Sequence, residues 1–194
     1  SGIGSHFAEH IIELLRWKND RAIVVLVVLG QGHVMDIRMT AARRGISVDV
    51  VGPEGPMLVV SDRAMLYRAF LNVLTNAVKF SHDGGAVEVV IKRVHPRVEI
   101  SVRDHGIGIP KTELDRLGTR FFRASNAMTN EIAGTGLGLR IVQTIVDRHA
   151  GDVIIESAEG EGTTVFVRLR LYAEPSSHDH RTDADAELRD EPVH

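Results

Sequence analysis

The sequence predicts an α+β domain, a two-layer α/β sandwich in which one mixed, mostly antiparallel sheet packs on helices. Residues 62–80 and 137–149 repeat apolar side chains at helical spacing, whereas 86–94 and 97–103 alternate apolar and polar residues as strands do. Turn residues separate these stretches, and there is no internal repeat. The order of helices and strands favours one antiparallel-rich sheet with helices on one face.

Composition limits the class of protein. With 194 residues and 43% hydrophobic content, the chain can bury one good core. A net charge of −3 and scattered basic residues argue against a nucleic-acid partner. The absence of cysteine excludes disulfides and thiolate zinc sites. No apolar run approaches the ~20 residues of a membrane helix, and no signal peptide is visible. We expect a cytosol-compatible domain that is monomeric by itself.

The first part of the chain, residues 1–22, begins with small residues typical of a cloning remnant. Apolar spacing predicts a helix at 7–17. The run at 23–29 fits either a strand or the start of a helix. A helix is favoured at 33–44, with Gly45 as its C-cap.

The next elements frame a long helix. Residues 46–51 and 58–60 read as short strands. We expect Ser61 to cap the following helix and Asp62 to lie in its first turn, where a carboxylate meets the positive end of the helix dipole. This helix should run to about residue 80.

The rest of the domain should alternate strands and helices up to a polar tail. In order, the pattern predicts strands at 86–94 and 97–103, a polar, irregular stretch at 110–131 with a short helix at 111–117, a helix at 137–149 ended by Gly151, and strands at 152–157 and 163–171. Beyond residue 172 large apolar side chains nearly vanish. We therefore assign 23–172 to the domain and 173–194 to a disordered acidic and polar tail.

The long helix carries a polar stripe. Its apolar arc, which should pack on the sheet, is Leu66, Phe70, Val73, Leu74 and Ala77. Asn72, Asn76 and Lys79 stand four and three residues apart, so they should share the opposite face. Two carboxamides and an ammonium suit a hydrated Mg²⁺ and a polyphosphate. Taken alone, the stripe is more typical of an ordinary solvated helix face.

Asp104 directly follows a predicted strand, in the sequence Asp104-His105-Gly106-Ile107-Gly108. A buried carboxylate at a strand end can accept a hydrogen bond from the exocyclic amine of adenine, and guanine offers an acceptor at that position. The two glycines would let the backbone approach a ring closely. The alternative is a β-turn with a capping aspartate.

A second glycine-rich segment, Gly134 to Gly138, opens the helix predicted at 137–149. Backbone amides at a helix N-terminus form an anion site. The glycine spacing differs from the dinucleotide fingerprint, and the Gly-Lys-Ser/Thr of a P-loop is absent. A flexible loop would use the same residues.

Taken in this order, the pieces resemble the boxes of the histidine-kinase catalytic domain, in the ATPase superfamily that includes type II topoisomerases and chaperone ATPases. The resemblance covers residues 45–171. The matching stretches are 71–81 for the asparagine box, 102–110 for the first glycine box, 120–123 for the phenylalanine box, 134–139 for the second glycine box and 160–166 for the closing glycine-threonine strand.

The resemblance implies a Bergerat-type ATP-binding fold with ATP and Mg²⁺ as cofactors. Asn76 would ligate Mg²⁺ with Asn72 beside it, and Lys79 would approach the phosphates. The other residues implied to contact the nucleotide are Phe80, Asp104, Gly106, Gly108, Ile109, Phe122, Arg123, Gly134, Gly136, Leu137, Gly138 and, through water, Thr164. Residues 111–133 would form a mobile lid. Residues 117–120 lack the aromatic and acidic residues that the family commonly has there.

The implied function is transfer of the γ-phosphate of ATP to a histidine on a separate dimerisation domain. Through that domain, a response regulator would be the next partner. This chain would then be the cytoplasmic domain of a membrane-bound sensor, and 1–22 would hold the end of a dimerisation helix. His10 lacks the phosphoacceptor context, because no acidic residue and Thr-Pro pair follow it.

Three alternatives come from the same superfamily. An ATP-hydrolysing switch would resemble its relatives in carrying a glutamate four residues before the Mg²⁺-binding asparagine, but Asn72 stands there and a carboxamide is no general base. An anti-sigma serine kinase is disfavoured by the phenylalanine box and the long lid. The intact boxes argue against a pseudokinase.

Overall fold

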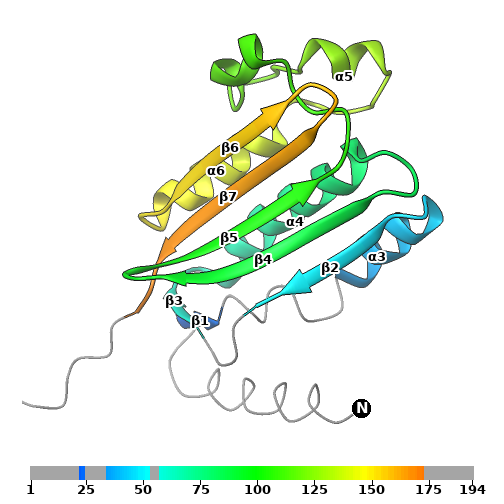
Figure 1. The fold of residues 1–194 in the computed structure, drawn as a ribbon. Helices are drawn as coiled ribbons and strands as arrows, with labels where there is room; N and C mark the ends of the chain where they lie inside the picture. Colours follow the sequence, from blue (N-terminus) through cyan, green and yellow to red (C-terminus); the bar gives the residue numbers. More distant parts are fainter. Residues whose placement is uncertain (1–21, 25–33, 53–56, 173–194) are drawn as a thin grey trace, which may run out of the picture.

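The computed structural model describes residues 22–24, 34–52 and 57–172 (Figure 1). The helix predicted at 7–17 and the tail predicted at 173–194 lie outside the described residues. The same holds for most of the ambiguous run at 23–29, of which only the start belongs to a described strand.

A five-stranded sheet forms the centre of the domain. Its strands, in spatial order, are β2 (Ser47–Val51), β4 (Ala86–Val94), β5 (Arg97–Asp104), β7 (Gly162–Arg170) and β6 (Asp152–Ala158). The β2–β4 pair is parallel and the other pairs are antiparallel. The prediction of a mixed, mostly antiparallel sheet is confirmed. A second, two-stranded sheet pairs β1 (Ala22–Val24) with β3 (Leu58–Val60).

Three helices cover one face of the large sheet: α3 (Val34–Arg43), α4 (Arg63–Phe80) and α6 (Gly138–Arg148) (Figure 1). The predicted apolar arc of α4 is buried throughout. It packs in one core with sheet residues such as Val89, Ile100 and Leu169. The two-layer sandwich is therefore confirmed, and burial of this arc fixes which side of α4 remains for chemistry.

The start of α4 differs from the prediction by one residue. Asp62, not Ser61, is the N-cap, and its carboxylate accepts a hydrogen bond from the Met65 N–H at 3.0 Å. Ser61 is buried, and its hydroxyl has no partner among the described residues. A serine whose side chain points into the core cannot reach the free N–H groups of a helix end.

Two helices end in the same hydrogen-bond pattern with different residues. Gly45 ends α3 with a left-handed φ of 66°, as predicted. At the end of α6, Ala150 rather than Gly151 is left-handed, with φ 51°. The hydrogen bonds around both positions are those of a Schellman motif. Gly151 is needed for space instead, because a β-carbon there would lie 2.3 Å from the Arg168 carbonyl oxygen.

The stretch predicted as irregular contains two short helices, the 3-10 helix η1 (Lys111–Arg116) and α5 (Ser125–Thr129). Figure 1 shows them at the end of the sheet where β5 and β6 finish. The expected short helix corresponds to η1, whereas α5 was not predicted. The Glu113 carboxylate accepts the Ser125 N–H at 2.9 Å and so caps α5 from another segment.

Candidate functional site

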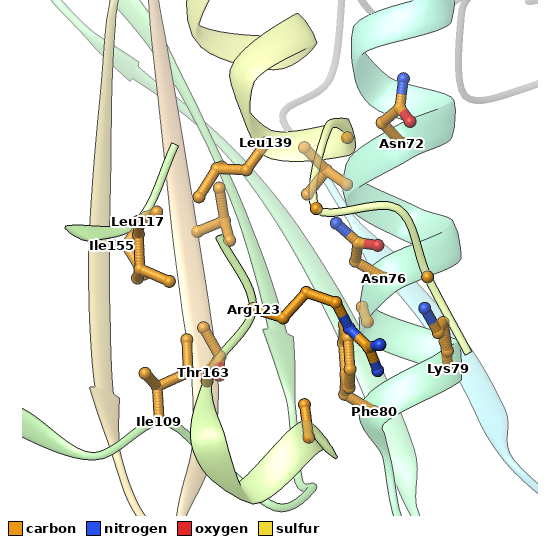
Figure 2. Close-up of a pocket in the computed structure, with 18 of the residues that line it drawn as sticks. Asn72, Asn76, Lys79, Phe80, Ile109, Leu117, Arg123, Leu139, Ile155 and Thr163 are labelled. Atoms are coloured by element: carbon orange, nitrogen blue, oxygen red, sulfur yellow. The ribbon is translucent and has the colours of Figure 1, made fainter. Parts of the chain in front are cut away.

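A cavity of about 490 Å³ opens between α4, the start of α6, the end of the sheet and the lid segment with η1 and α5 (Figure 2). Most of the predicted site residues line it: Asn72, Asn76, Lys79, Phe80, Asp104, Gly108, Ile109, Phe122, Arg123, Gly134, Gly136, Leu137 and Gly138. Four separated segments of the chain therefore converge on one volume large enough for a small ligand.

The polar stripe of α4 forms one wall. Figure 2 shows Asn72, Asn76 and Lys79 in a row along the helix. They are half-buried rather than solvated, because the second glycine segment lies over them. A β-carbon at Gly134 would lie 2.6 Å from Lys79 Nζ, and one at Gly138 would lie 3.2 Å from Asn72 Oδ1. The stripe is thus covered by the glycine segment rather than open to solvent.

Backbone amides form the facing wall. Leu137 is the N-cap of α6 and Gly138 its first residue, so unpaired N–H groups of this helix end lie beside the stripe. Gly136 has a left-handed φ of 70°, and a β-carbon there would approach the Phe122 carbonyl oxygen to 2.6 Å. Only glycine lets the segment pass this close to the phenylalanine box.

Two cations meet at this end of the cavity. Burial, and then the nearby Arg123 guanidinium, hold the pKa of Lys79 below its usual value. Arg123 itself donates to the Ile132 carbonyl. Within the described part of the chain, neither cation forms a salt bridge with a carboxylate. Two uncompensated positive charges beside a helix N-terminus make an electrostatic site for a polyphosphate.

Asp104, the last residue of β5, lines the cavity beside Thr163, which Figure 2 shows across the cavity from Lys79. Its side chain is buried, and a carboxylate oxygen accepts the Thr163 N–H at 3.2 Å. Burial raises its pKa to about 6, against the opposing effect of the Thr163 and Gly106 N–H groups and of His105. A buried acceptor at the end of a cavity suits an amine of a planar base.

The wall around Asp104 is apolar. Val102, Ile109, Ile155 and Val165 line this part of the cavity, together with Leu117 from the lid. Figure 2 shows Ile109, Ile155 and Leu117 across the cavity from the α4 stripe. One end of the cavity is therefore cationic and the other is apolar with one buried carboxylate, which matches the two ends of a nucleotide.

Two predicted contacts are absent from the cavity lining. Gly106 forms a bridge with Ser81, and a β-carbon there would lie 1.9 Å from the Phe80 carbonyl oxygen. Its role is to let the loop after β5 pack on the end of α4. Thr164 pairs with Arg103 on the face of the sheet away from α3, α4 and α6, whereas Thr163 lines the cavity. Because side chains alternate along a strand, the predicted position was one residue off.

Sequence reasoning missed Asn126, which lines the cavity from α5 and donates to the carbonyl oxygens of Ile107 and Gly108. An asparagine in a polar stretch carries no local signal.

The lid also docks without the residues usual in the family. A β-carbon at Gly118 would lie 2.1 Å from Gln143 Oε1, and the Arg116 guanidinium lies 4.3 Å from the centroid of the Phe122 ring.

The metal-binding capacity of the site rests on amides rather than on a carboxylate cluster. The described ranges hold no group of three or more His, Cys, Asp or Glu residues able to bind a metal ion. Asn72 and Asn76 supply neutral oxygen donors next to the proposed phosphate position, and Mg²⁺ is usually held by few protein groups plus phosphates and water. This donor set fits Mg²⁺ bound together with a polyphosphate.

No helix in the described residues is long and apolar enough to cross a membrane.

Curated relatives are similar in sequence to this chain. The Caulobacter vibrioides histidine protein kinase DivJ is 35% identical over 164 residues, which cover 84% of this chain and 27% of DivJ. The Staphylococcus aureus sensor protein kinase WalK is 38% identical over 139 residues, which cover 71% of this chain and 32% of WalK. The chain thus spans about a third or less of the length of these relatives.

Solved structures share its fold. The mycobacterial sensor histidine kinase MprB superposes with a TM-score of 0.65 at 31% identity, over 77% of this chain and 97% of that chain. Full-length ShkA in complex with AMPPNP superposes with a TM-score of 0.60 at 21% identity, over 87% of this chain and 35% of that one.

Residues 61–173, more than half of the chain, match the family described as histidine kinase-, DNA gyrase B-, and HSP90-like ATPase. This range contains α4, both glycine-rich segments and the lid, and hence every wall of the cavity. The chain therefore belongs to this ATPase family, as a catalytic domain of the sensor histidine kinase type.

Proposed function

We propose that this chain binds ATP with Mg²⁺ and transfers the γ-phosphoryl group to a histidine on a separate dimerisation domain, in two-component signalling. The observation that carries the proposal is the placement of Gly134 and Gly138 against Lys79 and Asn72. This contact lies in the same cavity as the buried Asp104. The complex of the relative ShkA with AMPPNP supports an adenine nucleotide as the ligand.

In this proposal the base lies among the apolar side chains and its exocyclic amine donates to Asp104. The triphosphate lies between the α4 stripe and the α6 N-terminus, where Lys79, Arg123 and backbone N–H groups neutralise its charge. Asn76, with Asn72 beside it, would hold Mg²⁺, which supplies further neutralisation of the phosphate oxygens.

The chain's contribution to the reaction is to orient the phosphoryl group and stabilise its charge. The nucleophile is an imidazole nitrogen of another domain, which bonds to the γ-phosphorus while the bond to the β–γ bridging oxygen breaks and ADP leaves. The imidazole proton passes to a base outside this chain. We infer that the parent protein is a membrane-bound sensor with this domain in the cytoplasm, and that a response regulator accepts the phosphoryl group next.

The position that separates a kinase from a hydrolase supports the kinase. Asn72 stands four residues before Asn76, and its Nδ2 donates to the Arg68 carbonyl at 2.8 Å. A carboxamide cannot take a proton from water, so the cavity has no general base at this place. We therefore expect ATP to persist in the site until an acceptor histidine arrives.

Calorimetric titration tests the binding step. We expect AMPPNP to bind the chain with 1:1 stoichiometry, and more tightly with Mg²⁺ than with a chelator. A GTP analogue should bind at least about tenfold more weakly, because its base presents an acceptor to Asp104. Equal affinity for the two bases, or no binding of AMPPNP, would contradict the proposal.

A further inference from the structure

Asn126 links the lid to the loop that follows β5. Its Nδ2 donates to the Gly108 carbonyl at 2.9 Å and to the Ile107 carbonyl at 3.3 Å. Only the nitrogen of the amide can face two acceptors, so the orientation of the side chain is determined. Its Oδ1 is buried and has no partner among the described residues. Both hydrogen bonds that this side chain donates therefore go to the loop after β5.

The loop itself does not depend on Asn126. The Ile107 N–H donates to the Phe80 carbonyl at 3.2 Å, and the Ile107 carbonyl also accepts the Gly160 N–H at 2.8 Å. Gly106 bridges to Ser81. These backbone bonds fasten the loop to α4 and to the β6–β7 turn, so the base end of the cavity should keep its shape without the Asn126 side chain.

The lid has weaker support. On the other side of α5, its N-terminus is capped by the half-buried Glu113, and Met128 is exposed. The chain on both sides of α5 reaches the cationic end of the cavity, through Arg123 before it and Gly134 after it. Arg123 and Ile132 are joined by a hydrogen bond, which makes this part of the lid a closed loop around α5.

We propose that Asn126 is a positioning residue that fixes the lid, and with it the phosphate-contacting segments, relative to the base loop. This inference rests on the proposed function, because it assumes a nucleotide whose base lies by Asp104 and whose phosphates lie by Arg123 and Gly134. Its consequence is specific: Asn126 strengthens the binding of the triphosphate while leaving the binding of the base unchanged.

The test compares Asn126→Asp with Asn130→Asp in the same chain. Asn126→Asp keeps the size of the side chain but sets a carboxylate against two carbonyl oxygens. Asn130 is an exposed asparagine of the same lid whose Nδ2 donates only within it, to the Asn126 carbonyl at 2.7 Å. The two variants therefore make the same chemical change with and without a link to the loop.

We expect Asn126→Asp to weaken AMPPNP binding by about tenfold or more, mainly through faster dissociation, and AMP binding by less than about twofold. Amide hydrogen exchange across 125–132 should rise, while the melting temperature should stay within about 2 °C of the parent. Asn130→Asp should change the AMPPNP affinity, the AMP affinity and the exchange rate by less than about twofold each. Its melting temperature should also stay within about 2 °C of the parent. Asn126→Ala removes the donor without adding charge and should show the same pattern with a smaller loss.

Three results would overturn the assignment. Unchanged AMPPNP affinity in Asn126→Asp and Asn126→Ala would show that the link does not position the lid. Equal losses for AMPPNP and AMP would place the effect in the base pocket. Equal losses of AMPPNP affinity in Asn126→Asp and Asn130→Asp would show that the added negative charge, and not the lost link to the loop, causes the loss. Failure of the parent chain to bind AMPPNP would instead contradict the proposed function, so the two failures are distinguishable.

Discussion

Gly134 lies so close to Lys79 that a β-carbon at position 134 would be 2.6 Å from the ammonium nitrogen. The second glycine segment thus touches the polar stripe of α4 directly. This relationship brings two weak sequence signals, a glycine cluster and a helix face, together at the proposed phosphate position.

The glycines of this segment should differ in their sensitivity to alanine. Gly136→Ala sets a methyl group 2.6 Å from the Phe122 carbonyl oxygen and forces alanine into left-handed backbone, so nucleotide affinity should fall more than about tenfold. Gly134→Ala meets only the mobile end of Lys79 and should cost less. Gly84→Ala is the control, because Gly84 is left-handed with open space around it. Nucleotide titration of all three variants should give Gly84→Ala the affinity of the parent. An equal loss of affinity in Gly84→Ala would show that left-handed backbone strain alone, wherever it lies, weakens binding.

Asp104→Asn should weaken AMPPNP binding by roughly 1.5–3 kcal/mol, because the carboxamide loses the charge that strengthens the hydrogen bond to the base. That is roughly ten- to a hundredfold in dissociation constant. Asp147→Asn makes the same change at an exposed position on α6 and serves as the control. If Asp104→Asn folds and binds like the parent, Asp104 does not hold the base.

Burial raises the pKa of Asp104 to about 6 from its ordinary value of 3.8, which has a consequence for stability. Between these values the folded state binds the proton and the unfolded state does not, so stability decreases as pH rises through this window. Between pH 4 and pH 7, the free energy of unfolding of Asp104→Asn should therefore rise by about 2.4 kcal/mol relative to that of the parent. Urea titrations at both pH values measure it. A pH-independent difference would show that burial does not raise this pKa.

Asn76→Ala should abolish the part of nucleotide affinity that depends on Mg²⁺. The reason is that Asn76 is expected to touch the nucleotide mainly through the ion. Titrations of AMPPNP with Mg²⁺ and with a chelator provide the comparison, and Asn130→Ala provides a carboxamide control away from the stripe. An equal loss under both conditions would assign a structural role to Asn76.

The fold could largely be predicted because its signals are local. The apolar arc of α4 and the alternation of β4 depend on neighbouring residues, and both were placed correctly. The stripe and the glycine segments were assigned to one nucleotide site through the family resemblance, and both line the same cavity. What the sequence could not show was their burial, since the contact between Gly134 and Lys79 joins segments far apart in the chain.

The errors arose where a distant contact or one residue of register decides the outcome. Side chains alternate between the two faces of β7, and Thr163 rather than Thr164 faces the cavity. Which of the two threonines faces the cavity is decided by the pairing of β7 with β5, which the local sequence does not show. The helix α5 was missed because Glu113, twelve residues away, caps it. Asn126 was missed for the same reason, since its partners lie in another segment.

Phosphoryl transfer to histidine can be measured by incubating this chain with γ-labelled ATP, alone and with its native dimerisation domain. We predict almost no label or free phosphate with the chain alone, and acid-labile label on the added domain. Transfer should be slower than in the intact parent, because the covalent link supplies proximity worth several kcal/mol. Acid-stable label on this chain alone would contradict the account and indicate a serine kinase, and rapid release of phosphate without an acceptor would indicate a hydrolase.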